Sequence, residues 1–174
     1  MDRDTLKAQI VSAFESVEYP GDWCLRGSNE GDEPYLVEAD FKGKVDRYAL
    51  PPEFLDQAPD GFATALSFFS DEAFRYYLPA YLLADLDGHL ESVTPVFHLT
   101  HGLDAASQAE HINPHRYGER TWSDHARCKF AMFDADQAAA IVGYLEAMRA
   151  DSELERERAS ITQALESYWY GRAD

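Results

Sequence analysis

Cysteine is scarce in this sequence. Its two cysteines, Cys24 and Cys128, stand far apart along the chain, whereas zinc sites built on cysteine need closely spaced pairs. This spacing excludes a cysteine-ligated zinc site. A disulfide between the two residues stays an open alternative, but we expect both to be free thiols, buried in a protein of a reducing compartment.

Long apolar runs are also missing. No segment approaches the about 18 apolar residues that a membrane-spanning helix needs. The first residues, MDRDTLKAQIVSAF, carry acidic side chains and lack the apolar core of a signal peptide. We therefore expect a cytoplasmic protein without membrane association.

Basic residues are few. The sequence has 15 lysines and arginines against 32 acidic residues, so the net charge is −17. Such a chain repels nucleic-acid phosphates and anionic membranes, which argues against both as partners. It favours fast, electrostatically steered encounter with a basic protein. The same acidity would also keep a protein in solution without any partner, so this alternative stays open.

Recognisable catalytic patterns are absent as well. Phosphate-binding loops need glycine amides that approach an anion, but Gly27 and Gly31 have acidic residues after them. The chain has no Gly-x-Ser-x-Gly turn for a serine nucleophile. His125 stands three residues before Cys128, a spacing that matches no catalytic pair we recognise. We expect a protein that is not an enzyme and that has no cofactor.

The histidines form the one pattern that suggests a metal. His98 and His101 make one pair and His111 and His115 another, at spacings that metal sites use. However, Pro114 disfavours a helix through the second pair, and no cysteine pair or His-Glu-x-x-His helix completes a ligand set. We expect no bound metal, and we keep open a small-ligand or metal-binding protein that uses segment 98–125.

The length of 174 residues and the 45% hydrophobic content predict one acidic globular domain over residues 1–174. A first helix should begin after Asp4 and end at Tyr19-Pro20-Gly21. Residues 34–42 fit a strand or a short helix, and we favour the helix. Pro51 and Pro52 should open another short helix. The first helix has an apolar face at helical spacing, formed by Leu6, Ile10, Phe14 and Val17.

The most apolar part of the chain predicts a central core helix over residues 65–86. Ser70 is the expected N-cap, with acidic residues in the positive first turn. Pro79 should kink or split this helix, because proline lacks the backbone donor. Gly88 should end it.

The remaining third of the chain is mixed. Residues 92–99 are β-branched and apolar and suggest one short strand, and residues 101–129 read as a long polar loop. Two capping boxes, Asp134-x-x-Gln137 and Ser152-x-x-Glu155, predict a C-terminal pair of helices that packs on the central helix. The fold class is therefore mainly α, or α+β if one or two short strands form.

A resemblance adds to this prediction. The run ALSFFSDEAFRYYLPAYLLADL resembles the core of a family of uncharacterised bacterial proteins, which also has a later helix and a terminal aL..YW motif. These features correspond here to residues 65–86, 133–145 and 164–169, in the C-terminal two-thirds of the chain. The loop of residues 101–129 looks longer than in the family. Because the family has no established activity, the resemblance implies a compact helical fold alone.

The expected function is that of a non-enzymatic immunity protein. By analogy of size and charge, the chain resembles proteins that neutralise toxins of bacterial secretion systems, including type VI effectors such as nucleases. A nuclease has a basic groove that an acidic protein can block. A housekeeping interaction protein stays the other alternative. The expected contacts are the acidic residues of loop 22–33 and its neighbours: Asp22, Glu30, Asp32, Glu33, Glu38 and Asp40.

Overall fold

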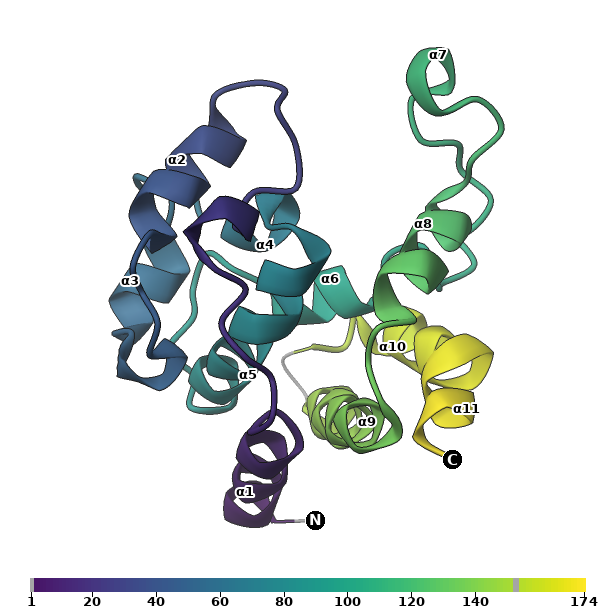
Figure 1. Cartoon of the computed structure of the whole chain (residues 1–174). Coiled ribbons are helices and arrows are strands. Elements are labelled where there is room, and N and C mark those ends of the chain that lie inside the picture. Colours follow the sequence, from purple (N-terminus) through teal and green to yellow (C-terminus); the bar gives the residue numbers. More distant parts are fainter. Residues whose placement is uncertain (1, 152–153) are drawn as a thin grey trace. The chain divides into compact units, whose positions relative to one another are not determined.

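Helices make up the regular structure of this protein (Figure 1). The computed structural model describes residues 2–151 and 154–174. Over these residues no β-strand occurs, and the only strand-like pairings are two isolated bridges. The mainly α prediction is confirmed. No helix among the same residues is long and apolar enough to cross a membrane.

The chain folds into two compact units, and α1 (Arg3–Ala13) contributes to both. The middle unit comprises residues 10–95, and the terminal unit comprises residues 1–9 together with 96–174. The middle unit contains six short elements: η1 (Asp22–Cys24), α2 (Glu33–Phe41), η2 (Arg47–Ala49), α3 (Pro52–Gln57), α4 (Ala65–Phe68) and α5 (Asp71–Leu86).

The first helix is shorter than predicted. Leu6, Ile10 and Phe14 are buried as expected, but α1 ends at Ala13 and Val17 lies beyond it, half-buried. The guanidinium of Arg47 donates hydrogen bonds to the carbonyls of Phe14 and Val17. The Phe14 carbonyl also accepts the amide of Val17 at 3.1 Å, so a turn and a cation together satisfy main-chain carbonyls just beyond the end of α1.

Two short helices agree with the sequence. α2 and α3 each carry a proline at one of their first two positions, where its missing N–H is not needed. The favoured helix over residues 34–42 is therefore confirmed. Val37 and Phe41 of α2 are fully buried.

The central run forms two helices rather than one, because the chain breaks at Phe69. The amide of Gly27 donates to the Phe68 carbonyl at 2.8 Å, and the amide of Ser70 donates to the Leu25 carbonyl at 2.9 Å. These bonds to a neighbouring segment replace helical ones. Ser70 then caps α5, accepting a bond from the Ala73 amide at 3.0 Å. Pro79 lies inside α5 and does not split it.

The terminal unit is built around α9 (Ala135–Ala150), which packs against the last three elements of the chain. Trp169 is fully buried and donates its indole N–H to the Leu99 carbonyl at 2.9 Å. The other elements of this unit are α6 (Pro95–Thr100), α7 (Pro114–Tyr117), α8 (Trp122–Phe130), α10 (Arg158–Ala164), the π-helical turn η3 (Leu165–Trp169) and α11 (Tyr170–Ala173).

The predicted strand over residues 92–99 is wrong, because residues 95–100 form α6. Proline is tolerated in the first turn of a helix. Val96, Leu99 and Leu103 are buried at three- and four-residue spacing, which is the period of a helix and not of a strand. The β-branched residues of the segment favoured a strand, but the segment forms a helix.

The predicted loop over residues 101–129 is also only partly right. It includes α7, at the far end of a protruding connection (Figure 1), and most of α8. α8 begins with a capping box of Thr121 and Asp124 that the sequence analysis missed. The capping box of Asp134 and Gln137 is confirmed.

The second predicted capping box cannot be followed in the structure, because Ser152 lies outside the described residues. The helix expected after it begins only at Arg158. Packing of the C-terminal helices on the central helix stays a prediction.

Candidate functional site

The six predicted contact residues all belong to the middle unit. That unit has 17 acidic and 5 basic residues, and so carries −12 of the total charge of −17. The terminal unit carries the other −5. Negative charge is thus concentrated on the unit that holds the predicted contacts.

Asp22 is exposed but fixed in place. Its Oδ1 accepts the hydroxyl of Tyr19 at 2.5 Å and the amide of Gly43 at 2.8 Å. The Tyr19 bond is the main reason that the pKa of this carboxyl lies below its usual range, with the Gly43 amide and the charge of Lys42 adding to it. Asp22 therefore joins η1 to the start of the 43–48 segment while staying charged.

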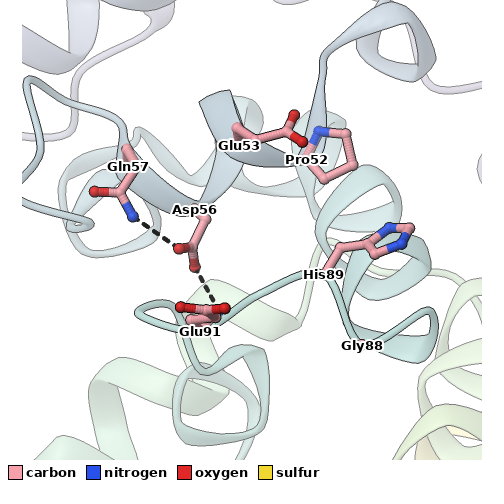
Figure 2. Close-up of a pocket in the computed structure, with 7 residues that line it drawn as sticks. All are labelled: Pro52, Glu53, Asp56, Gln57, Gly88, His89 and Glu91. Carbon is pink, nitrogen blue, oxygen red and sulfur yellow. Dashed lines mark hydrogen bonds between the residues drawn. The ribbon is translucent and has the colours of Figure 1, made fainter.

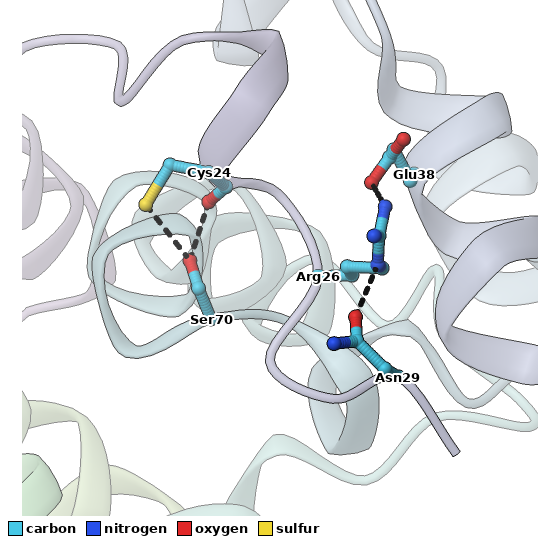
Figure 3. A network of polar contacts seen from close by, with 5 residues as sticks. All are labelled: Cys24, Arg26, Asn29, Glu38 and Ser70. Carbon is cyan, nitrogen blue, oxygen red and sulfur yellow. Dashed lines mark hydrogen bonds and ion pairs between the residues drawn. The ribbon is translucent and has the colours of Figure 1, made fainter.

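Glu38 is paired within the protein. Its carboxylate forms an ion pair with Arg26, whose Nε also donates to Asn29 at 3.1 Å (Figure 3). The same guanidinium lies over the ring of Tyr35, 4.4 Å from its centroid. These contacts fasten the acidic loop to α2. Because a cation already compensates its charge, Glu38 has less to offer a partner than an unpaired carboxylate.

The other four predicted contacts differ in how far they are engaged. Asp40 accepts the amide of Asp60 at 3.2 Å. Asp32 precedes α2, and its carbonyl accepts the amide of Leu36 at 3.0 Å. Glu30 and Asp32 are exposed, and Glu33 is half-buried at the helix start. Solvent-facing carboxylates thus remain along residues 30–33.

The surroundings of Cys24 are not those of a nucleophile. The Cys24 thiol lies 3.8 Å from the Ser70 hydroxyl (Figure 3) and 3.7 Å from the Glu72 carboxylate. Burial raises the pKa of this thiol, and the charge of Glu72 adds to the effect, so little thiolate forms. Both cysteines are free as expected. The prediction that both are buried is wrong, since Cys24 is half-buried and Cys128 is exposed.

One pocket of the middle unit was not foreseen (Figure 2). It has a volume of about 430 Å³ and lies between α3 and the connection after α5. Asp56 is its one buried carboxylate, and both of its oxygens are used by hydrogen bonds from the protein. The pocket therefore offers no free buried group for chemistry. Its lining residues are Pro52, Glu53, Asp56, Gln57, Gly88, His89 and Glu91.

Ring contacts through Phe97 and Trp122 connect three of the histidines. The ring of His101 stacks on Phe97 with centroids 4.9 Å apart, and it meets the edge of Trp122 at 4.8 Å. The ring of His125 also contacts Trp122, with centroids 5.7 Å apart. His98, next to Phe97, completes the group. The residues that the structure describes contain no group of three or more metal-ligating side chains.

His98 should make the protein sensitive to acid. Burial, with Lys129 and His101 adding repulsion, lowers its pKa from 6.5 to about 3. The unfolded chain takes up this proton between these two values and the folded chain does not, so stability falls as the pH drops through this window. Since one pKa unit corresponds to about 1.4 kcal/mol, lowering the pH from 6.5 to 4.5 should remove about 2–3 kcal/mol through this group.

Urea denaturation of the wild type and of His98→Gln across this pH range would measure the effect. The variant should lose less stability on acidification than the wild type. His115→Gln is the matched control, because His115 is exposed on α7. Parallel pH curves for all three proteins would show that His98 does not carry the acid sensitivity.

Comparison with known proteins gives one match. The profile of a protein family, described as "Family of unknown function (DUF6714)", matches residues 2–173. The match extends the resemblance seen in the sequence, which covered residues 65–169, to nearly the whole chain. No curated protein and no solved structure matches this chain.

Proposed function

Because the chain belongs to DUF6714, a family of unknown function, we propose its role from its charge and surface alone. The proposed role is that of a non-enzymatic binding protein that neutralises a basic toxin. The finer form of this proposal is an immunity protein against an effector, such as a nuclease, of a type VI secretion system.

The observation that carries the proposal is the charge of the middle unit. This unit has 17 acidic residues and only 5 basic ones. One of the five, Arg47, is buried. A surface of this kind attracts a positively charged protein over long range and raises the rate of encounter. A nuclease presents such a positive surface, since its groove binds phosphates.

The absence of catalytic patterns in the sequence is consistent with this role. A neutralising protein needs no reactive group, because it acts by occupying the surface that the toxin uses. The raised pKa of Cys24 and the saturated carboxylate of Asp56 are consistent with binding rather than chemistry.

We take the product of the gene next to this one as the candidate toxin. The proposal then predicts a strong effect of salt on its association with this protein. The association rate should fall at least about tenfold between 0.01 M and 0.15 M salt, because the Debye length shrinks from about 30 Å to about 8 Å. Dissociation should change much less, since it depends on close contacts. Stopped-flow kinetics would measure both rates, and co-expression would show whether growth is rescued.

Charge-reversed variants locate the steering surface. Glu30, Asp32 and Glu33 changed to lysine should slow association. A matched control reverses three exposed carboxylates of the terminal unit, Glu110, Glu155 and Glu166, and so changes the net charge equally. Equal slowing by both triple variants would assign steering to net charge and not to this loop. If growth is not rescued and no complex forms, the toxin proposal is wrong.

A further inference from the structure

Three large apolar side chains of the middle unit are exposed on η1 and on residues 43–48, two segments that a hydrogen bond between Gly43 and Asp22 joins. Trp23 is 86% exposed, Val45 is 57% exposed and Tyr48 is 42% exposed. We call these three residues the Trp23 surface. Single exposed apolar residues are common, so exposure alone does not identify a binding surface. The contacts between the segments that carry these residues are therefore decisive.

Polar contacts connect the segments that carry the Trp23 surface. The hydrogen bond from the Gly43 amide to Asp22 places the residue before Trp23 beside the start of segment 43–48. The hydroxyl of Tyr76 donates to the carbonyl of Val45. The guanidinium of Arg47 lies over the rings of both Tyr48 and Tyr76, at 5.0 Å and 4.5 Å. Segment 43–48 and η1 therefore form one connected piece of surface.

The backbone of segment 43–48 is fixed by hydrogen bonds with the buried Tyr77 and with the exposed Asp46. The hydroxyl of Tyr77 donates to the Lys44 carbonyl at 2.7 Å. The carboxylate of Asp46 accepts the amides of Tyr48 and Ala49 at 3.0 Å and 3.2 Å. Val45 and Tyr48 thus project from an ordered loop. A surface that is ordered before binding loses less conformational entropy when a partner docks.

Trp23 is positioned by the glycine that precedes it by two residues. Gly21 has a φ of +91°, which favours glycine. A Cβ atom at this position would lie 2.6 Å from the indole Nε1 of Trp23, so a side chain there would force the ring to move from the position that it takes beside Gly21. The indole rests on this backbone and still exposes most of its surface.

We propose that the Trp23 surface is the docking site for a basic protein partner, with Trp23 as its anchor. This inference rests on the proposed function in taking the partner to be basic. Aromatic side chains at the centre of an interface, surrounded by polar ones, carry most of the binding energy in many complexes. Trp23 is also the side chain whose ring face best attracts an arginine or lysine.

Charges next to the Trp23 surface favour a basic partner. Glu18, Asp22 and Asp46 are exposed on the same segments, where Lys42 is the exposed base. Lys44 is half-buried, and its ammonium lies 5.0 Å from the centroid of the Phe54 ring. Over residues 18–24 and 42–48, the exposed carboxylates therefore outnumber the exposed bases by three to one.

Photo-crosslinking in cells tests the proposal. p-Benzoylphenylalanine replaces Trp23 in one variant and Phe62 in another, in cells that also express the neighbouring gene. Phe62 is the matched control, because it is a 59% exposed aromatic residue of the same unit. Position 23 should crosslink to one basic protein, and position 62 should not. An acidic protein, a second copy of this chain, or no crosslink at position 23 would overturn the inference.

Affinity then tests the energetic role of the anchor. Trp23→Ala should weaken the purified complex with the crosslinked protein at least about tenfold, whereas Phe62→Ala should leave it within about twofold. Circular dichroism would establish that both variants fold. If the neighbouring gene product binds and rescues growth but Trp23→Ala binds as the wild type does, the inference fails and the proposed function stands. If position 23 captures a basic protein that is not a toxin, the toxin role fails and the docking site stands.

Discussion

Replacing Arg47 with alanine should lower the free energy of unfolding by about 3–5 kcal/mol, because three main-chain carbonyls would lose their charged donor. Arg47 is only 5% exposed. Its Nη1 donates to the carbonyls of Val17 and Tyr76, at 3.3 Å and 3.1 Å, and its Nη2 donates to the carbonyl of Phe14. One side chain thus joins the end of α1 to α5.

The loss of stability is large because alanine would leave main-chain carbonyls without their donor. Three carbonyls would lose a charged donor, and each hydrogen bond to a charged group contributes about 1.5–3 kcal/mol. The rings of Tyr48 and Tyr76 would also lose the guanidinium that lies over them. Because those contacts order segment 43–48, the loss should extend to the Trp23 surface.

Chemical denaturation of three variants would separate the effect of the positive charge of Arg47 from the effect of its guanidinium geometry. Arg47→Lys keeps the charge but lacks the planar fork that reaches several carbonyls at once, so it should fall between the wild type and Arg47→Ala. Lys42→Ala removes an exposed cation nearby and should change stability by no more than about 0.5 kcal/mol. A loss below about 1 kcal/mol for Arg47→Ala would mean that water replaces the guanidinium and that the end of α1 needs no cap.

The sequence predicts the helices best where the signals are local. Ser70 and Asp134 each cap a helix through an amide three residues away, and that spacing is visible in the sequence. The apolar spacing of Leu6, Ile10 and Phe14 likewise lies on one stretch of chain. Local signals of this kind need no knowledge of the tertiary structure.

The errors arise where the decisive contact is distant in sequence. The break at Phe69 depends on backbone bonds with Leu25 and Gly27, which no pattern within residues 65–86 reveals. Most hydrogen-bond partners of Arg47 and Asp56 are main-chain groups, and these carry no sequence signature. For the same reason the acidic residues of loop 22–33 could be recognised from composition, but the ion pair of Glu38 with Arg26 and the exposure of Trp23 could not.

Replacing Asp56 with alanine should lower the free energy of unfolding by about 3–5 kcal/mol as well. Oδ1 of this buried carboxylate accepts three successive amides, those of Glu91, Ser92 and Val93, at 2.9, 2.8 and 3.1 Å. Oδ2 accepts the side-chain amide of Gln57 at 2.8 Å (Figure 2). Without the carboxylate, the connection between α5 and α6 would lose its attachment to α3, and buried amides would be left without an acceptor.

The pH dependence of the free energy of unfolding separates the effect of the Asp56 charge from the effect of its shape. Burial alone would raise the pKa of this carboxyl, but the hydrogen bonds from Ser92, Val93, Gln57 and Glu91 outweigh it, so the pKa is lowered from 3.8. A lowered pKa in the folded state gives stability that is fully present above the unfolded value. That stability is lost as the pH falls through the folded value.

The destabilisation caused by Asp56→Asn should therefore be constant near neutral pH and shrink below about pH 4, where Asp56 of the unfolded wild-type chain begins to take up a proton. Glu53→Gln is the matched control, since it removes one negative charge from an exposed position of the same helix and the same pocket. It should change stability by no more than about 0.5 kcal/mol. Urea titrations of the three proteins between pH 3 and pH 7 would provide the comparison. If Asp56→Asn is as stable as the wild type at pH 7, the three amides need only an acceptor, and the negative charge of Asp56 has no part in holding the connection to α3.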